Sequence, residues 1–447
     1  MKKIFSKYKY RIAILGIAVV AALVTIIIGS TYGNNEINGI RYAITKDGYQ
    51  VIDYNGDSEV VKIKTKFKGE YVTSIGSEAF FNNKEITKVI LPQNLKIIEE
   101  NAFANCIKLS EINLVDSIEV IEEGAFRNTL LYNLDLPKSM KVLNKGVLLT
   151  NNGVIEVPET IEEISESAFS NVIGLKEVKL PNTIRSIGSY AFYMCENLKK
   201  INLPDTIESI GKNAFNNTGI ESIVLPKNLT VLEDSVFYGC NNLKEVILNE
   251  GLLEIKDNVF TWCDSLITIN IPNTVEKLGY ECFSYSGLIK VVIPNSVKEI
   301  SSNIFCYCTS LKDLSLPFIG ATSSNNKDIY YFFSGTKNSY NDPVALEIVR
   351  VTGDKVSIGK KAFAYSKTIK ELHLETVISI GEEAFTSNEM ISKIYLGKSL
   401  ANAHEFTFHK GINVDSLELY CDFTKEYADQ YFDENWYALY VNVHYKG

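Results

Sequence analysis

The stretch LPNTIRSIGSYAFYMCENLKKINLP, residues 180–204, decides the fold because the chain repeats it. Residues 203–226 read LPDTIESIGKNAFNNTGIESIVLP, and residues 271–294 read IPNTVEKLGYECFSYSGLIKVVIP. The period is 21 to 23 residues. A fixed period of this length is typical of stacked units, none of which can bury its apolar face alone, so neighbouring units share one long core.

One position marks each unit most clearly, a phenylalanine that usually follows alanine. Its occurrences are Phe80, Phe103, Phe126, Phe169, Phe192, Phe215, Phe237, Phe260, Phe283, Phe305, Phe363, Phe385 and Phe408. Leu148 replaces the phenylalanine in one shortened unit, and residues 318–355 are longer than any normal unit. We expect the polar turn-forming runs of this insert, such as TSSNNKD, to project as a loop. The run IYYFFSG within it could supply one degenerate turn.

Within a unit, the apolar residues predict a strand followed by a corner. Leu175, Val178 and Leu180 have the spacing by which a short strand turns alternate side chains inward. Pro181 then removes a ladder donor and ends the strand. Mixed three- and four-residue spacing leads on to Phe192 and indicates a tight corner with a short helical turn. The predicted fold class is a β-rich repeat solenoid, with a parallel sheet on one side and short helical turns and loops on the other.

The repeat resembles the leucine-rich repeats of the Treponema pallidum type, the BspA-like family of bacterial and protist surface proteins. The match covers roughly residues 71–420, and about a dozen units keep the pattern LP-x-x-I-x-x-I-G-x-x-A-F-x-x-C/T-x-x-L-x-x-I in phase. The resemblance implies a leucine-rich-repeat solenoid. It also implies adhesion to host proteins, matrix or other cells.

Residues 1–33 predict a membrane-directed segment. Five basic residues lie between Lys2 and Arg11, and the apolar run Ile12–Ile28 is interrupted only by Thr25. A helix of this length spans about 26 Å, close to the thickness of the hydrocarbon core, and its basic flank should stay cytoplasmic. We expect a transmembrane signal anchor at residues 12–28 that leaves the remainder outside the cell. A cleaved signal peptide, which would make the protein secreted, is the alternative.

The remaining chain predicts one repeat domain with two caps. Residues 34–70 do not repeat, and apolar and polar residues alternate there around Asp47-Gly48, as is typical of a β hairpin. We therefore expect an N-terminal β cap at 34–70, the solenoid at 71–420 with its insert at 318–355, and a C-terminal cap at 421–447. A solenoid needs such caps because its terminal layers would otherwise expose apolar surface.

The chain has a formal net charge of −9. The first acidic residue is Glu36, so the body that follows the basic N-terminus is more acidic than this total. An acidic surface repels phosphate backbones. We therefore expect no nucleic-acid partner.

Eight cysteines in an exported protein would ordinarily indicate disulfides. Five of them share one repeat position, three residues after the phenylalanine: Cys106, Cys195, Cys240, Cys263 and Cys308. Other units place threonine or serine there, as at Thr218 and Ser286. The position therefore suits a small, mildly polar group, and we expect buried free thiols.

Two segments come close to known catalytic or binding motifs. The histidines of His404-Glu405-Phe406-Thr407-Phe408-His409 are five residues apart, whereas the zincin motif needs four. Gly397-Lys398-Ser399 ends like a phosphate-binding loop but lacks the first glycine, and it replaces the Pro-Asn-Thr of the repeat. No nucleophile-elbow, dinucleotide-binding or zinc-ribbon pattern occurs. We expect no enzyme, no catalytic, cofactor-binding or metal-binding residues, and no cofactor.

Two stripes of residues could bind a partner. The first is the outward position of the strand, which should face the concave side of the stack. Its centre is unusually apolar for an exposed face because it carries Val224, Ile247 and Val292. The polar Asn270 lies among them at the same position of its repeat. The alternative interpretation is that β-branched residues merely suit strands.

The second stripe lies two residues after the phenylalanine, where early units carry asparagine. Later units carry Trp262, Tyr285 and Tyr307 there. Stacked aromatic side chains could hold sugar rings or a partner's side chains. They could equally pack only on one another.

These observations predict a non-catalytic cell-surface solenoid that binds proteins or mediates adhesion to host, matrix or other cell-surface partners. One alternative is a cell-envelope scaffold or sensor that binds wall polysaccharide or another bacterial surface protein. A third class is a glycan or peptide hydrolase built from long-range contacts. The oligomeric state and the ligand remain open at this point.

Overall fold

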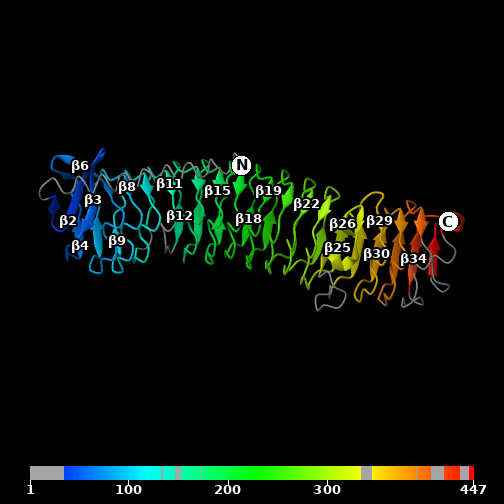
Figure 1. Ribbon diagram of the computed structural model, residues 1–447. Coiled ribbons are helices and arrows are strands. Elements are labelled where there is room, and N and C mark those ends of the chain that lie inside the picture. The colour runs from blue at the N-terminus through cyan, green and yellow to red at the C-terminus, as the bar shows by residue number, and fades with distance from the viewer. Residues whose placement is uncertain are drawn as a thin grey trace. The chain divides into compact units, whose positions relative to one another are not determined.

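The computed structural model describes residues 35–131, 134–145, 153–172, 174–333, 345–388, 390–403, 417–432 and 442–446. The chain divides into two compact units, residues 1–149 and 150–447. Within each unit the repeats form stacked turns with parallel strands, so the predicted β-solenoid is confirmed (Figure 1). The predicted membrane segment and Leu148 lie outside the described residues. Among the residues described, no helix is long and apolar enough to span a bilayer.

The predicted strands form what we call the primary ladder. In the first unit it comprises β4 (Val60–Lys62), β7 (Lys88–Ile90) and β9 (Glu111–Ile112). In the second unit its strands are β12 (Val154–Glu156), β14 (Glu177–Lys179), β16 (Lys200–Ile201), β18 (Ser222–Val224), β20 (Glu245–Ile247), β23 (Lys290–Val292), β25 (Asp313–Leu316), β28 (Ile348–Val351), β30 (Glu371–Leu374), β32 (Lys393–Leu396), β34 (Glu418–Cys421) and β35 (Asn442–Tyr445). Corresponding residues of successive repeats pair in register, as Val178 does with Ile201.

A second ladder of two-residue strands, not predicted, runs along each unit (Figure 1). In the first unit this secondary ladder comprises β8 (Ile97–Ile98), β10 (Val120–Ile121) and β11 (Val142–Leu143). In the second unit its strands are β13 (Glu163–Ile164), β15 (Ser186–Ile187), β17 (Ser209–Ile210), β19 (Val231–Leu232), β21 (Glu254–Ile255), β22 (Lys277–Leu278), β24 (Glu299–Ile300), β29 (Ser357–Ile358), β31 (Ser379–Ile380) and β33 (Asn402–Ala403). Each turn of the solenoid thus has two extended sides joined by corners.

The N-terminal residues of the first unit form antiparallel strands at the start of its stack. The strands are β1 (Glu36–Ile37), β2 (Ile40–Thr45), β3 (Gly48–Tyr54), β5 (Lys66–Phe67) and β6 (Glu70–Ile75). The hairpin predicted at Asp47-Gly48 is confirmed, because β2 and β3 pair antiparallel around it. β6 then pairs in parallel with both β3 and β8, so it joins the hairpin to the secondary ladder.

The corner before each primary strand is a run of hydrogen-bonded turns, whereas a short helical turn was expected. The residues two before and two after the core phenylalanine have positive φ, as at Asn213 (56°) and Asn217 (54°) around Phe215. Left-handed backbone is accessible to asparagine and glycine but costly for most other residues. Two such residues per corner prevent a regular helix from forming.

The core phenylalanines stack on one another between layers. The Phe192 ring lies 4.9 Å from the Phe169 ring and 5.3 Å from the Phe215 ring, with interplanar angles of 7° and 4°. All three side chains are fully buried, as predicted. Offset stacking at these distances adds to the stabilisation from burying the rings.

The cysteine position bridges neighbouring layers. The Cys195 thiol donates to the carbonyl oxygen of Phe169 at 2.9 Å, and the Cys240 thiol donates to that of Phe215 at 3.1 Å. Asn388 makes the equivalent bond to Phe363 through its side-chain amide. All eight cysteines are buried and carry no disulfide in the structure. The position therefore selects a small hydrogen-bond donor.

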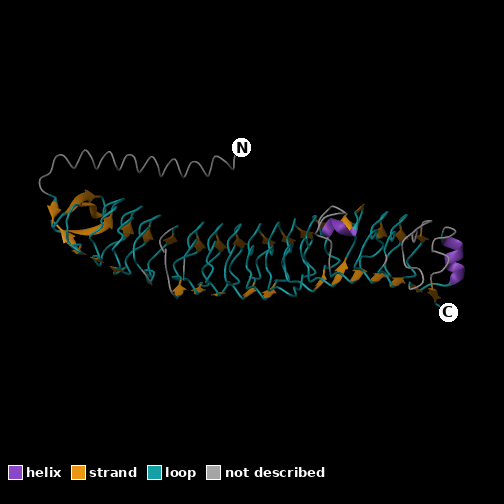
Figure 2. Ribbon diagram, turned by 90° about the horizontal axis from the view of Figure 1, so that it is seen from below, coloured by secondary structure: helices purple, strands orange, loops and turns teal. Residues whose placement is uncertain are grey.

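Residues 329–333, from the run IYYFFSG, pack into the stack as the expected degenerate turn, whereas residues 322–328, the run TSSNNKD, are exposed or half-buried in the described part of the insert. This part contains the hairpin β26 (Gly320–Thr322) and β27 (Asn325–Asn326) and the 3₁₀ helix η1 (Ile329–Phe332) (Figure 2). Ile329 and Phe332 are fully buried, and the Phe305 amide donates to the Phe332 carbonyl at 2.8 Å. These apolar side chains replace those of a normal corner. Residues 334–344 lie outside the described chain.

Near the C-terminus, helix α2 (Lys425–Tyr431) follows β34 and precedes β35 in the chain (Figure 2). The two strands themselves pair directly with each other. The Thr424 hydroxyl accepts a hydrogen bond from the Tyr427 amide and caps the helix. Ala428 is buried, and the Tyr427 hydroxyl donates to the Leu400 carbonyl at 3.1 Å. These contacts attach the helix to the last turns of the stack.

Replacing a ring in the stack should destabilise several layers together. We expect Phe192→Ala to lower the free energy of unfolding by about 3–5 kcal/mol, because it removes a fully buried ring and leaves a cavity. Phe81→Ala is the control, since this phenylalanine is 42% exposed, and it should cost less than about 0.5 kcal/mol. Chemical denaturation measures both, and equal losses would contradict the stacked core.

The cysteines of the shared position should react only after unfolding. Burial raises the pKa of Cys106, Cys240 and Cys308 to about 11 and that of Cys195 to about 12. Because the thiolate is the reactive form, alkylation of the folded protein at pH 8 should be slow. Mass spectrometry after alkylation in denaturant without reductant should find all five modified. Two or more disulfides among them would refute this arrangement.

Candidate functional site

The outward side chains of the primary ladder form the surface on which the first stripe was predicted. Val224 is 58% exposed, and Ile247 and Val292 are each 49% exposed. Their strand neighbours Val246 and Val291 are buried. The predicted alternation is therefore confirmed: these residues point away from the core because successive side chains of a strand point to opposite faces.

Among the described residues of the second unit, the primary ladder is interrupted between β16 and β18 and again between β20 and β23. A groove lies at the second of these interruptions. Between β20 and β23, residues 268–270 form no strand, and only the isolated bridge from Thr268 to Lys290 remains. The groove is open and encloses about 700 Å³. Ile247, Asn270 and Val292 all line it. The structure thus brings together three of the four residues predicted for the first stripe, and Val224 pairs with Ile247 in the adjoining layer.

The chain that leaves β20 differs in sequence from the usual repeat. After β20 the usual Leu-Pro becomes Leu248-Asn249. The Asn249 amide donates to the carbonyls of Lys227 at 2.9 Å and Leu229 at 2.8 Å. These bonds hold the chain that leaves β20 against the preceding turn. The ladder breaks on the other side of β20, between that strand and residues 268–270.

Sequence reasoning missed two exposed apolar residues on this side of the molecule. Ile267 is 51% exposed and Ile289 is 43% exposed, and the Ile289 amide donates to the Ile267 carbonyl at 3.0 Å. They occupy the position just before the strand, where the neighbouring repeats have Lys244 and Lys312. The replacement of lysine by isoleucine at this position could have indicated an exposed apolar patch from the sequence alone.

Ion pairs between layers border the groove. The Lys290 ammonium lies 3.2 Å from the Asp313 carboxylate, and the Lys244 ammonium lies 3.8 Å from that of Glu221. A hydrogen bond from Lys199 lowers the pKa of the Glu221 carboxyl, and the charges of Lys199 and Lys244 lower it further. Exposed pairs of this kind stabilise the fold little. They surround an apolar centre with charged groups, the arrangement common at protein interfaces.

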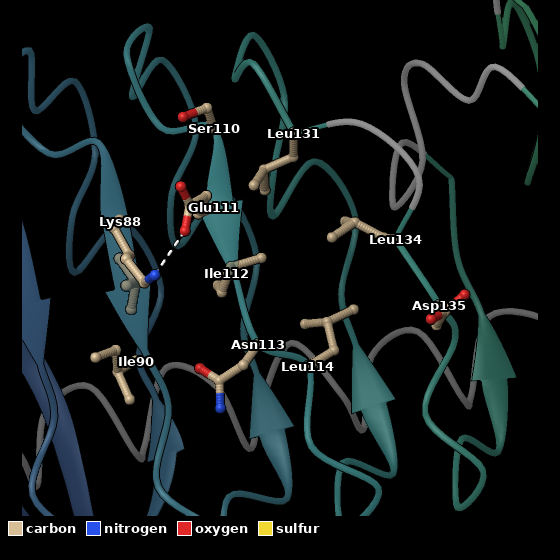
Figure 3. A pocket seen from close by; sticks show the side chains of 11 residues that line it. Lys88, Ile90, Ser110, Glu111, Ile112, Asn113, Leu114, Leu131, Leu134 and Asp135 are labelled. Carbon is tan, nitrogen blue, oxygen red and sulfur yellow. Dashed lines mark hydrogen bonds and ion pairs between the residues drawn. The ribbon is translucent and has the colours of Figure 1, made fainter.

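The first unit has a smaller groove on the outward face of its primary ladder (Figure 3). It encloses about 540 Å³, and the ion pair of Lys88 and Glu111, at 2.6 Å on two adjacent strands, lies in its lining. The Asn113 side-chain oxygen accepts a hydrogen bond from the Leu91 amide at 2.8 Å. The charged and amide side chains named here thus already have partners within the chain.

The second predicted stripe forms a stack at the corner rather than on the primary ladder. The Trp262 and Tyr285 rings lie 3.9 Å apart, and the Tyr285 and Tyr307 rings lie 4.3 Å apart, nearly parallel in both cases. Burial raises the pKa of Tyr285 to about 12, and a hydrogen bond with Tyr307 adds to the shift. The rings cover each other's faces. The faces between the rings are therefore closed to a sugar, although Trp262 and Tyr307 are each 40% exposed.

These aromatic residues stand at the left-handed position that asparagine occupies in earlier turns. The φ angles are 62° at Trp262, 54° at Tyr285 and 57° at Tyr307. A bulky residue is strained in this conformation, and such strain is often found at functional sites. Here the interplanar stacking offsets part of that cost, so a structural role accounts for the residues as well as a functional one.

A second aromatic stack was not predicted. On the outward face of the last primary strands, rings follow one another at 4.4, 4.9 and 4.9 Å in the order His373, Tyr395, Tyr420, His444. The His373 ring nitrogens contact Glu371 at 2.6 Å and Glu375 at 3.1 Å. The sequence could have indicated this stack, because aromatic side chains recur at the outward strand position in successive repeats.

The two near-motifs give no chemical site in the described chain. Gly397-Lys398-Ser399 forms the turn after β32, as its place in the repeat predicted. A Cβ atom on Gly397 would lie 1.7 Å from the Glu375 carbonyl oxygen, so the glycine allows two layers to approach closely. Residues 404–409, with His404 and His409, lie outside the described residues. Within the described ranges, no group of three histidine, cysteine or acidic residues is arranged to hold a metal ion.

The chain is similar to several solved structures, and the first one named here supports the fold. A leucine-rich repeat protein from Bacteroides ovatus is 24% identical, with a TM-score of 0.50, and the match covers 93% of this chain and all of that one. A leucine-rich cell surface protein from Faecalibacterium prausnitzii is 18% identical over 89% of this chain and 97% of its own, with a TM-score of 0.41. The Treponema pallidum leucine-rich repeat protein is 24% identical, with a TM-score of 0.27. The match covers 52% of this chain and 89% of that one.

No curated protein matches the chain. A family profile does, described as "BspA type Leucine rich repeat region (6 copies)", and it matches residues 73–186, 148–263, 230–339 and 336–439. The description of this family indicates no enzymatic activity. Since the matched ranges overlap and run without a break from residue 73 to residue 439, the chain belongs to the BspA-type leucine-rich repeat family.

Proposed function

We propose that this chain is a non-catalytic binding scaffold of the cell surface, and that it mediates adhesion by docking a protein in the groove between β20 and β23. The observation that carries the proposal is the exposed apolar centre of that groove. Ile247 and Val292 lie on it, with Ile267 and Ile289 exposed nearby in sequence. Apolar side chains exposed together on a rigid scaffold are typical of docking sites.

The rim supports a protein partner in particular. Interface centres are apolar and depleted of charge, whereas their borders are polar and solvated. The groove has this distribution, with Lys244 and Lys290 at its border. The ammonium groups already pair with Glu221 and Asp313, so docking need not leave a buried lysine uncompensated.

Display outside the cell is the second part of the proposal. The basic residues and the apolar run Ile12–Ile28 favour a signal anchor, with cleavage and secretion as the alternative. Membership of a family of surface proteins agrees with export. The acidic body makes a nucleic-acid partner unfavourable.

A cell-envelope scaffold that binds wall polysaccharide is the second candidate function. The two aromatic stacks favour it, because sugars pack on aromatic rings. The stacks turn ring faces towards one another, however, and this leaves mainly ring edges for a ligand. We therefore rank the polysaccharide below the protein partner, and a hydrolase below both.

Charging the groove tests the proposal. The full-length chain, purified in mild detergent, is measured against a panel of matrix proteins, bacterial surface proteins and wall polysaccharides. Ile247→Lys combined with Val292→Glu should reduce binding of a protein partner at least about tenfold, because it removes apolar contact and places charge at the interface centre. The fold should survive, since both side chains point outward.

The matched control is Leu253→Lys with Val154→Glu, which introduces the same charges at exposed apolar residues that do not line the groove. This variant should bind like the wild type. A folded groove variant with unchanged affinity for every bound partner would refute docking at this site.

A further inference from the structure

An asparagine occupies the outward strand position in three repeats that read alike: EINL at Asn113, KINL at Asn202 and TINI at Asn270. In the repeat of Asn202, the side-chain amide takes the place of the backbone hydrogen bond between layers that other repeats make here, such as the bond from the Leu225 amide to the Ile247 carbonyl. The Asn202 Oδ1 accepts from the Leu180 N–H at 2.7 Å, and its Nδ2 donates to the Leu180 carbonyl at 2.7 Å. One amide thus binds both polar groups of a single extended residue. Asn113 makes the first of these two bonds to Leu91.

Asn270 differs although its repeat position is the same. The equivalent residue in the preceding layer is Leu248, and within the continuous stretch 174–333 no hydrogen bond joins Leu248 to the Asn270 side chain. Nor does any backbone hydrogen bond in that stretch join residues 267–271 to β20. Asn270 is exposed and lines the groove. Its amide therefore faces the open groove with both its donor and its acceptor free of partners in the described chain.

We propose that Asn270 binds the main chain of an extended peptide segment of the partner, by the same pair of hydrogen bonds that Asn202 makes to Leu180. The inference rests on the proposed function and specifies its ligand class. The peptide's N–H would donate to Oδ1 and its carbonyl would accept from Nδ2. Its apolar side chains would contact Ile247 on one side and Val292 on the other. This is recognition of extended backbone combined with side-chain contacts.

The lining of the groove favours a peptide over a sugar. None of the side chains that line it is aromatic. Sugar sites usually include an aromatic ring on which the sugar packs. The interrupted ladder also leaves main-chain groups of β20 facing the groove, and an extended segment pairs with such groups readily.

The probe is a displayed library of linear twelve-residue peptides, selected on the full-length chain and counter-selected on the Ile247→Lys, Val292→Glu variant. Peptides that bind the wild-type chain but not this variant need the intact groove for binding. Asn270→Ala should then weaken their binding about tenfold, because two hydrogen bonds are lost from a desolvated interface. Asn241→Ala is the matched control, since this asparagine is exposed at a corner and should leave binding unchanged.

Backbone N-methylation of the peptide identifies the bond directly. One backbone N–H of the peptide is expected to donate to Asn270. Replacing that N–H by N-methyl should weaken binding to the wild-type chain about tenfold, as Asn270→Ala does. The same methylation should cause little further loss with Asn270→Ala, because both changes remove one interaction. As a check on the template, Asn202→Ala should lower the thermal midpoint of unfolding, whereas Asn270→Ala should not.

Each other outcome is decisive. Groove-dependent peptides that bind Asn270→Ala as tightly as the wild type would overturn this inference and leave groove docking intact. Selection that yields no groove-dependent peptide, or a wall polysaccharide fragment that binds in the groove instead, would also overturn it. Failure of the proposed function is distinct, because no partner of any class would then respond to the charged groove variant.

Discussion

The stack of phenylalanine rings is the interaction on which the rest of the structure depends. The two faces of each ring are covered by the rings of the turns before and after it. Phe169 and Phe215 cover the two faces of Phe192 in this way. The repeat length follows from this constraint, because every turn must return the ring to the same place above its neighbour. The insert obeys it too: the Phe333 ring lies 6.1 Å from Phe305 where no normal repeat supplies one.

The corner geometry explains substitutions that composition alone does not. A turn must reverse direction around each ring, and it does so with two left-handed residues, as at Asn101 and Asn105 around Phe103. Asparagine is frequent there because its short polar side chain tolerates the conformation. Where Trp262 and Tyr285 replace it, the backbone is unchanged and ring stacking is gained. The same frame thus tolerates different side chains at the surface of the corner.

Sequence reasoning recovered what the period encodes and missed what depends on geometry within a turn. The burial of Phe192 and the exposure of Ile247 follow from recurrence and strand alternation, and both were predicted. The secondary ladder was missed because a strand as short as Ser186–Ile187 shows no alternation from which to infer it. Three residues of the groove were among those predicted, but the interruption that forms it was missed for another reason. The groove arises from a missing ladder contact, whereas the TINI repeat around Asn270 reads like the KINL repeat around Asn202, which does make its contact.

That difference shows how a repeat protein can acquire a binding site without disturbing its core. Inward positions such as Val246 and Ile269 are buried and limited to apolar residues by the stack. Outward positions are not, and a side chain there serves the fold only if the neighbouring layer supplies a partner. Asn202 has such a partner in Leu180, so its amide is committed to stability. Asn270 has none in the described chain, so the same chemical group, at the same position, is available to recognise another molecule.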